Sequence, residues 1–346
     1  MAATQHLSFV HPLAAPCARG DVRLFIVAER DLDGFGLAAF RRALADLVAQ
    51  ARPTVVVFSR AGTRFAGDIL AVARGAGARV VAHLDDDLFN VPEALGAAKA
   101  AMHNDPARLA RLMVVCRRAD AIYASTAALG EVLADRFPDR TVIPGALYAA
   151  AHEPFQAFRV GGPPVFGYMG TAGHGGDLEA IAPAIADVLT RVPQARFETF
   201  GTIKAPPALT RFGERVTAHP RTADYPSFLE RLKGLGWRAG LAPLNDTPFN
   251  ACKADTKFVE YAQSGIPSVL ARGRVYARPL QEGAAWGAHT PQDWADAVVK
   301  LLEDEAEASR LAQAAQACLR QWYSVGTLEA QAMAVLAPRD QAAAPI

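Results

Sequence analysis

Short apolar runs alternate with helical stretches from residue 22 onward, and this alternation constrains the fold more than any other feature of the sequence. Strands that alternate with helices form βαβ units, which assemble into a parallel sheet covered by helices on both faces. The expected strands are residues 23–28, 54–59, 79–84, 121–125, 141–143, 165–169, 196–201, 215–218, 237–244 and 266–271. The expected helices lie near 35–50, 64–76, 92–117, 126–137, 176–191, 224–233, 251–264 and 291–337. The pattern predicts an α/β protein with doubly wound sheets.

The alternation lapses between Pro144 and Pro164, where four prolines and three glycines occur without a clear period. Such a segment is typical of a linker between domains. We therefore expect two Rossmann-like domains, a small N-terminal one over residues 1–150 and a C-terminal one with a helical tail over residues 151–346. In open parallel sheets, ligands bind beyond the carboxyl ends of the strands. Two such sheets that face each other predict a central cleft lined by residues that follow strands.

The composition excludes several classes of protein. The formal net charge is +1, so no global field attracts nucleic acid, and we expect no nucleic-acid partner. The four cysteines are scattered without disulfide or metal-site spacing and indicate reduced thiols in a cytoplasmic protein. No apolar run reaches the roughly 20 residues of a membrane span, and the N-terminus lacks the pattern of a secretory signal. Peripheral association with a membrane stays open.

The segment at residues 241–271 predicts a strand, a helix and a second strand. On the expected helix, Lys253, Lys257, Glu260 and Ser264 share one face, because they are spaced four, three and four residues apart. A lysine in the first turn opposes the helix dipole, so an anion bound there would gain from both the ammonium and the dipole. Glu260 could accept hydrogen bonds from two vicinal hydroxyls, as a ribose presents. The alternative is a solvated face with a weak Lys257–Glu260 ion pair.

A glycine-rich turn follows the strand expected at residues 165–169. Gly170 and Gly173 permit close approach of the backbone, and exposed amides there could hold a phosphate. The turn is not a GxGxxG fingerprint and by itself is weak evidence. For His174 the alternative is an exposed turn residue, and for Asp177 we expect helix capping.

Three carboxylates, Asp85, Asp86 and Asp87, follow the strand expected at residues 79–84. Uncompensated, they repel one another, which raises the pKa of at least one or attracts a cation or a hydroxylic ligand. One interpretation is a general base for an acceptor hydroxyl, and another is a metal-binding D-x-D pair. The third is a helix N-cap, which we favour for Asp87. The eight histidines show no metal-ligand spacing, and we expect no metal.

Residues 238–270, RAGLAPLNDTPFNACKADTKFVEYAQSGIPSVL, resemble the nucleotide-sugar-binding core of GT-B-fold glycosyltransferases. The resemblance is to the family 4-like group of bacterial polysaccharide and glycoconjugate assembly, whose members carry a run similar to D-[IV]-G-L-A-P-L…F-N…K-S…K-[FW]-x-E-Y-x-x-x-G-x-P-V-V. The turn at residues 167–181 is similar to the G-x-x-G-[ST]…H-x-x-D-L of such enzymes. Two positions depart from the pattern. Cys252 stands where many relatives have a Glu that contacts the donor sugar, and Ala254 stands where Ser is usual.

The resemblance implies a GT-B enzyme that moves a sugar from a nucleoside-diphosphate sugar to a hydroxyl of a glycan, lipid-linked or protein acceptor, with retention of anomeric configuration. It implies that Lys253 and Lys257 hold the diphosphate and that Glu260 binds the ribose. The full set of expected donor-binding residues is Gly170, Thr171, Gly173, Lys253, Lys257 and Glu260, and the expected catalytic residues are Asp85, Asp86 and His174. The nucleotide sugar is a substrate, and we expect no separate cofactor. The alternatives are a sugar-nucleotide epimerase or hydrolase of the same fold, and a catalytically silent partner that holds a glycan or nucleotide.

Overall fold

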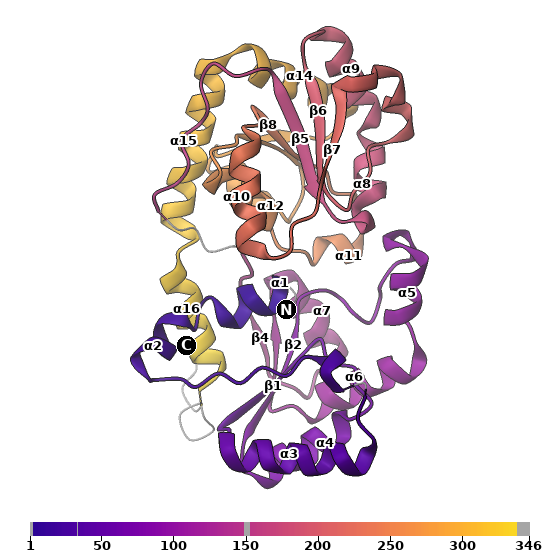
Figure 1. Cartoon of the computed structure of the whole chain (residues 1–346), viewed down its shortest axis with the longest axis vertical. Helices are drawn as coiled ribbons and strands as arrows, with labels where there is room; N and C mark the ends of the chain where they lie inside the picture. The colour runs from indigo at the N-terminus through magenta and orange to yellow at the C-terminus, as the bar shows by residue number, and fades with distance from the viewer. Residues whose placement is uncertain (1–2, 33, 149–152, 338–346) are drawn as a thin grey trace.

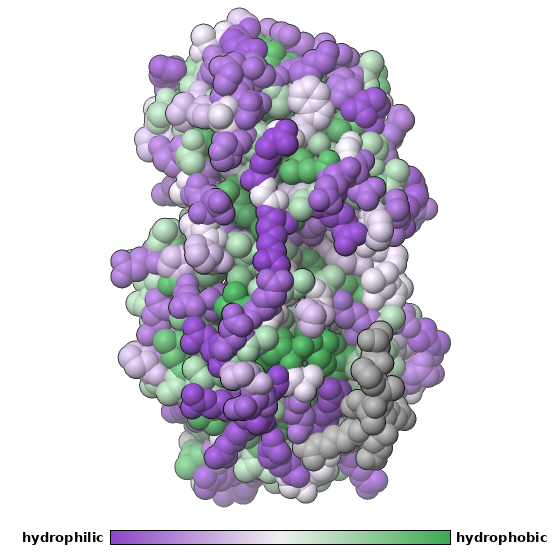
Figure 2. Space-filling view, turned by 180° about the vertical axis from the view of Figure 1, so that it is seen from behind, coloured by the Kyte–Doolittle hydropathy of each residue, from purple (hydrophilic) through white to green (hydrophobic). Residues whose placement is uncertain are grey.

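The computed structural model describes residues 3–32, 34–148 and 153–337, which form two lobes stacked along the long axis of the molecule (Figure 1). The space-filling view from behind shows the outline narrowing between the lobes (Figure 2). Each lobe is built on its own parallel sheet, as the alternation of strands and helices predicts. The expected domain boundary between residues 150 and 151 lies outside the described residues, so the division into 1–150 and 151–346 stays a prediction.

The N-terminal lobe contains four parallel strands in the order β1-β2-β3-β4. They are β1 (Val55–Ser59), β2 (Arg79–Leu84), β3 (Ala121–Ala124) and β4 (Val142–Pro144). Both faces of the central strands are covered, so β2 is buried along its whole length, including its two polar residues, Arg79 and His83. The helices of this lobe are α1 (Ala3–Gln5), the π-helix η1 (His6–Val10), α2 (Ala14–Arg19), η2 (Glu29–Leu32), α3 (Leu37–Ala51), α4 (Ala66–Gly75), η3 (Glu93–Leu95), α5 (Ala97–His103), α6 (Pro106–Arg118) and α7 (Ala127–Arg136).

The C-terminal lobe contains six parallel strands in the order β10-β9-β8-β5-β6-β7. They are β5 (Val165–Gly170), β6 (Arg196–Gly201), β7 (Val216–Pro220), β8 (Ala239–Ala242), β9 (Ser268–Ala271) and β10 (Trp286–Ala288). The chain adds β6 and β7 on one side of β5 and then β8, β9 and β10 on the other. The topological switch point, where ligands bind in open α/β sheets, therefore lies between β5 and β8.

Helices and aromatic side chains cover this second sheet. The helices that follow β5 are η4 (Ala172–His174), α8 (Gly175–Ala180), α9 (Ala182–Arg191), η5 (Pro207–Arg215), α10 (Tyr225–Leu235), α11 (Pro248–Ala251), α12 (Thr256–Gln263), α13 (Ala277–Gln281), α14 (Pro291–Glu303), α15 (Glu305–Trp322) and α16 (Val325–Val335). Two strand glycines admit large rings. A Cβ on Gly167 would lie 2.3 Å from Trp237, and one on Gly240 would lie 2.7 Å from Tyr261. No helix among the described residues is long and apolar enough to cross a bilayer.

The last helix, α16, returns to the N-terminal lobe (Figure 1). The guanidinium of Arg79 in β2 donates to the carbonyls of Val335 and Ala337, both at 2.8 Å. Gln331 of α16 accepts from the amide of Ala146, just after β4, at 2.8 Å. The chain therefore passes between the lobes at the linker after β4 and again between α15 and α16, and the helical tail is shared by both lobes.

The strand expected at residues 23–28 is wrong. The segment pairs with no described strand, and its run of large apolar side chains is exposed, with Phe25 53% and Val27 51% accessible. Its composition suits a strand, but strand propensity acts only where the side chains can pack. Here Phe9 and Leu13, from the preceding N-terminal segment, pack into the cluster on the sheet face instead.

The other expected strands are confirmed within a few residues, and β10 is an addition to them. The helical segments expected near residues 92–117 are η3, α5 and α6, and a proline marks the start of the last one. Pro106 begins α6, and the Asp105 side chain caps this helix by accepting from the amide of Arg108 at 2.8 Å. A capping aspartate followed by proline is a strong start signal, so α5 and α6 are separate helices.

Candidate functional site

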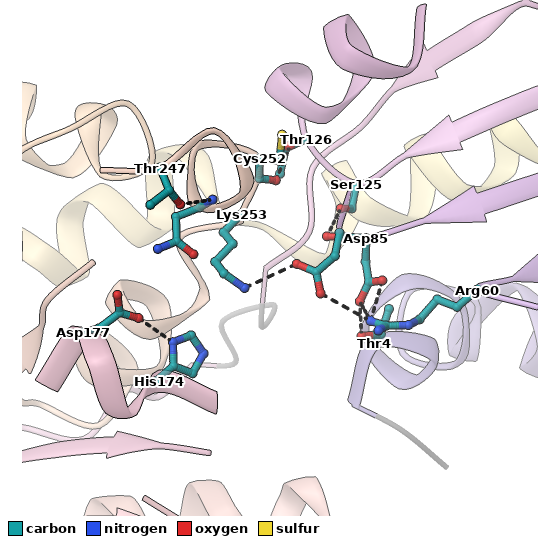
Figure 3. A network of polar contacts seen from close by, with 12 residues as sticks. Thr4, Arg60, Asp85, Ser125, Thr126, His174, Asp177, Thr247, Cys252 and Lys253 are labelled. Carbon is teal, nitrogen blue, oxygen red and sulfur yellow. Dashed lines mark hydrogen bonds and ion pairs between the residues drawn. The ribbon is translucent and has the colours of Figure 1, made fainter. Parts of the chain in front are cut away.

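Polar side chains gather where the carboxyl ends of the two sheets face each other across the lobe junction (Figure 3). The C-terminal lobe contributes the turn after β5 and the segment after β8, which flank its topological switch point. The N-terminal lobe contributes the residues that follow β1 and β2. In both lobes, the polar side chains at the junction are therefore ones that directly follow strands, as the rule on ligand binding predicts.

The segment after β8 forms two short helices, α11 and α12, instead of the single helix expected over residues 251–264. The turn between them is fixed by Asp255, whose carboxylate accepts from the hydroxyl of Tyr323 at 2.5 Å. Lys253 lies in this turn. It therefore does not share a helix face with Lys257 and Glu260, and the expected single stripe is wrong.

Lys253 reaches from the C-terminal lobe to the N-terminal lobe. Its Nζ lies 3.4 Å from Oδ1 of Asp86, and it sits 4.8 Å from the ring centroid of Phe249. Figure 3 shows the side chain pointing across the junction toward the acids that follow β2. A cation is therefore held at the point where the strand ends of both sheets meet.

Lys257 and Glu260 are the charged pair of α12. Burial lowers the pKa of Lys257 and raises the pKa of Glu260, and the charge of each partner opposes the shift of the other. The hydroxyl of Tyr225 donates to Oε1 of Glu260 at 3.1 Å. Ser264 is buried and donates to the carbonyl of Glu260 at 2.8 Å, so it ends the helix and faces no ligand. A partly dehydrated ammonium and carboxylate interact strongly with a charged or hydroxylic ligand.

The turn after β5 brings Gly170, Thr171 and Gly173 to the junction. Gly201, at the end of β6, lies against the end of β5. A Cβ on Gly201 would lie 2.3 Å from the carbonyl oxygen of Gly170, so only glycine fits there. A Cβ on Gly173 would lie 3.2 Å from the carbonyl oxygen of Leu95 in the N-terminal lobe. Thr171 is exposed and precedes η4. The backbone of this turn therefore lies against the opposite lobe.

His174 is oriented by Asp177 (Figure 3). Its Nδ1 lies 2.9 Å from Oδ2 of Asp177, and Oδ1 of Asp177 accepts from the amide of Asn245 at 2.9 Å. The helix cap expected for Asp177 is wrong, because α8 begins without a side-chain cap and the carboxylate joins the two switch-point loops. The charge of Lys257, followed by burial, lowers the pKa of His174 to about 4. The imidazole is therefore neutral near pH 7, and Nε2 is free to accept when Nδ1–H donates to Asp177.

The acids after β2 lie in different surroundings. Asp85 accepts from the Arg60 guanidinium at 2.6 Å through both oxygens, and Oδ2 also accepts from the hydroxyl of Thr4 at 2.5 Å. Burial by itself raises the pKa of Asp85, but the Arg60 charge and these hydrogen bonds outweigh it and hold the pKa below its ordinary value. Asp86 contacts Lys253 and lies 3.6 Å from Arg60. Asp85 is thus ionised, and the two acids face one cation from each lobe, Arg60 and Lys253.

Asp87 has a local role. Its carboxylate accepts from the amide of Phe89 at 3.2 Å and from the side chain of Asn90 at 2.6 Å. These bonds close a turn, and no helix begins at the acids, since the next helical element, η3, starts at Glu93 with Pro92 as its cap. The N-cap interpretation is therefore wrong for this run.

Arg60 is a site residue that the sequence interpretation missed. It follows β1 directly and has φ of 55°, a left-handed conformation that L-residues other than Asn and Asp rarely adopt. Its amide donates to the carbonyl of His83 at 2.9 Å, and its carbonyl accepts from Arg108 at 3.0 Å. Strained backbone of this kind persists where surrounding bonds enforce it, and it is common at functional sites. Its position at a strand end was the available signal.

Cys252 faces the N-terminal lobe. With Phe249, it is buried in the apolar cluster that includes Leu88 and Val91. Its carbonyl accepts from the hydroxyl of Thr126 at 2.8 Å. Burial raises the pKa of the thiol to about 11. Cys252, which stands where the pattern of the resembled group has a Glu, therefore packs between the lobes as an apolar side chain.

The described residues also bear on whether the protein could hold a metal ion. Within residues 3–32, 34–148 and 153–337, no group of three or more His, Cys, Asp or Glu side chains is arranged to hold a metal ion. No protein-family model matches the sequence, and no curated protein matches it either.

Solved structures share the two-lobed architecture. The Anabaena protein HepE in complex with UDP-glucose matches with a TM-score of 0.60 and 17% identity, over 86% of this chain and 82% of that one. Sucrose-phosphate synthase from Thermosynechococcus elongatus matches with a TM-score of 0.61 and 14% identity, over 93% and 82% of the two chains. A UDP-forming trehalose-phosphate synthase from Burkholderia xenovorans in complex with glucose-6-phosphate matches with a TM-score of 0.56 and 14% identity, over 89% and 80%.

These likenesses show the fold. The chain has the GT-B architecture of its glycosyltransferase neighbours, with two Rossmann-like units that face each other, and the predicted fold class is confirmed. At these identities the comparisons define the class of fold, and the function has to be argued from the site.

Proposed function

We propose that this protein is a glycosyltransferase that moves a sugar from a nucleoside-diphosphate sugar to a hydroxyl acceptor. The observation that carries the proposal is the 3.4 Å contact between Lys253 of one lobe and Asp86 of the other, at the facing ends of two parallel sheets. A cation beside the switch point suits a departing diphosphate, and a carboxylate opposite it suits an incoming hydroxyl.

On the donor side, Lys253 and Lys257 stabilise the diphosphate as it leaves the anomeric carbon. Because burial and its charged neighbours perturb Lys257, a bound diphosphate would favour its protonated form. Glu260, which already accepts from Tyr225, would accept from the vicinal hydroxyls of the ribose. The backbone at Gly170, Thr171 and Gly173 would approach the phosphates and the sugar. HepE, a neighbour in fold, was solved with UDP-glucose, which supports a nucleotide sugar as the ligand class.

On the acceptor side, Asp85 and Asp86 receive the hydroxyl, and one of them accepts its proton. His174 is neutral and presents Nε2 as an acceptor, so it orients a hydroxyl of the donor sugar while Asp177 fixes the ring. Resemblance to the family 4-like group of polysaccharide and glycoconjugate enzymes supports retention of configuration and a glycan, lipid-linked or protein acceptor. The four free cysteines support work in the cytoplasm, where thiols stay reduced.

A ligand screen tests the donor half of the proposal. Thermal unfolding is followed with UDP-, GDP-, ADP-, CMP- and dTDP-linked sugars, and the matching sugar should raise Tm because it binds only the folded state. Lys253→Met should abolish the rise. Lys300→Met, which removes an exposed lysine of α14, should keep it. Equal shifts for both variants would contradict the assigned phosphate site.

A turnover assay separates the alternative chemistries. Sugar or epimer released from the donor without any acceptor would indicate an epimerase or hydrolase. Donor binding without turnover against glycan, lipid-linked and protein acceptors would indicate a silent binding partner. Transfer that requires a hydroxyl acceptor and fails in Asp86→Asn would support the proposal.

A further inference from the structure

The N-terminal segment, residues 4–13, supplies a hydroxyl to the acid pair, which is Asp85 and Asp86. Thr4, in α1, donates from Oγ1 to Oδ2 of Asp85 at 2.5 Å, and Figure 3 shows the two side chains together at the lobe junction. Asp85 is 7% exposed and ionised, so it can accept this proton. A hydroxyl hydrogen-bonded to a carboxylate is the geometry that general-base activation of an acceptor requires.

Fixed anchors hold this segment in place. The side chain of Gln5 donates to Oγ of Ser59 at 2.9 Å. Farther along, the ring of Phe9 meets His83 edge-on, with centroids 4.9 Å apart, and Leu13 is fully buried. Thr4 therefore reaches Asp85 from a packed element, because the residues that follow it are bound to the strand ends of the N-terminal lobe.

The same segment also touches the donor side. The ring of His6 lies 6.0 Å from that of Tyr225, whose hydroxyl donates to Glu260. Lys253, proposed for the diphosphate, contacts Asp86, the neighbour of Asp85 in sequence. The segment thus runs from the carboxylate proposed for the ribose to the carboxylates proposed for the acceptor, and Thr4 lies at the acceptor end.

Other hydroxyls nearby are differently engaged. The Ser125 hydroxyl donates to the backbone carbonyl of Asp85, and the Thr126 hydroxyl donates to the carbonyl of Cys252. The Ser59 hydroxyl lies between Gln5 and the ring of His83. Among the Ser and Thr residues that the structure describes, Thr4 is the one whose hydroxyl donates to a side-chain oxygen of the acid pair.

We propose that Thr4 is an internal acceptor and that the chain transfers one sugar to its own N-terminal segment. This inference rests on the proposed function. Oγ1 of Thr4 forms a bond to the anomeric carbon, the bond from that carbon to the diphosphate oxygen breaks, and its electron pair leaves with the nucleoside diphosphate. The proton of the Thr4 hydroxyl passes to Asp85. The products are a glycosylated threonine and a free nucleoside diphosphate.

Mass spectrometry of the full chain tests this modification site. The purified protein is incubated with UDP-glucose, UDP-galactose, UDP-N-acetylglucosamine and GDP-mannose, and intact mass and N-terminal peptides are measured before and after. We expect a mass gain of one sugar per chain, located on Thr4, either on purification or after incubation with one donor. Thr4→Ser should still be modified, Thr4→Val should not, and Thr210→Val, at an exposed threonine of η5, should behave as wild type.

The outcomes separate the two proposals. If a donor raises Tm and its sugar moves to an added hydroxyl acceptor while Thr4 stays unmodified, the internal acceptor is overturned and the proposed function stands. If the sugar moves only to water and Thr4 stays unmodified, both proposals are overturned, because that result indicates a hydrolase. The internal acceptor is also overturned if Thr4→Val speeds transfer to an added acceptor and the wild type carries no sugar, because Thr4 would then only occupy the site. If no nucleotide sugar binds the wild type, both proposals fail.

Discussion

The two lobes build their shares of the site by different means. In the C-terminal lobe, six strands reverse their order at β5 and β8, and this reversal leaves the gap that the switch-point loops line. In the N-terminal lobe, the four described strands follow chain order, and the polar groups depend on ion pairs and on a strained Arg60. In the C-terminal lobe, the position of the site therefore follows from the order of the strands. In the N-terminal lobe, it depends on individual charged side chains. Single substitutions should accordingly disturb the folding of the N-terminal half more.

The largest expected effect is on stability and follows from Arg60→Gln. The change leaves the Asp85 carboxylate buried without its cation, so the free energy of unfolding should fall by about 3 kcal/mol. Chemical denaturation measures this. Arg41→Gln removes an exposed ion pair with Asp68 and should cost less than about 1 kcal/mol. Lys253→Met should also cost less than about 1 kcal/mol, since its contact is partly solvated. Equal costs for all three variants would remove the contrast between the lobes.

The next effect concerns transfer. Asp86→Asn should lower the rate of transfer to an added hydroxyl acceptor about 100-fold, because the amide cannot take up a proton. Donor affinity should change by less than about threefold, which is under 1 kcal/mol. Calorimetry and a transfer assay measure the two quantities separately. Asp46→Asn, on the exposed face of α3, is the matched control. Parallel loss of binding and transfer would place Asp86 on the donor side.

His83 in the N-terminal lobe and His174 in the C-terminal lobe allow a direct comparison of the two lobes. The pKa of each is lowered to about 4, but burial is the main cause for His83 and the charge of Lys257 is the main cause for His174. Lys257→Met should therefore raise the pKa of His174 and leave that of His83 unchanged. NMR titration of the imidazoles measures both pKa values, and an equal rise in both would contradict the assigned causes.

The same pKa values determine how stability depends on pH. A histidine whose folded pKa lies below its unfolded value of 6.5 binds fewer protons when folded. Its contribution to the free energy of unfolding therefore rises with pH from about 4 to 6.5 and is constant above that range. His174→Gln should therefore make the free energy of unfolding rise less steeply between pH about 4 and 6.5. Some rise should remain, because His83 still contributes.

The smallest expected effect tests the exposed segment beside β1. Phe25→Ser should change the free energy of unfolding by less than about 0.5 kcal/mol, because its side chain is mostly solvated. A loss of about 3 kcal/mol or more, of the order seen for buried Phe, would show that residues 23–28 pair as a fifth strand. That result would restore the strand that the sequence predicts and lessen the difference between the lobes.

Sequence reasoning succeeded where one rule governed a whole element. β-branched runs predicted the strands. The strand-end rule pointed to Lys253, His174 and the acids after β2, which lie at the lobe junction and whose roles stay predictions. It failed where distant contacts decided the local structure. The break before α12 depends on Tyr323, and the loss of the strand at residues 23–28 depends on packing by Phe9 and Leu13. No local signal in the sequence indicates that Thr4 meets Asp85, because 81 residues separate them.

The return of α16 to the first sheet also affects the order of folding. Arg79 of β2 bonds to carbonyls at the end of α16, and Val335 is buried in the cluster that covers the face of that sheet. The ribosome makes the N-terminal lobe first, yet that lobe lacks its cover until α16 (Val325–Val335) has been made. Domains generally mature in the order of synthesis. In this protein, the C-terminal lobe can complete its core before the N-terminal lobe does, although it is made second.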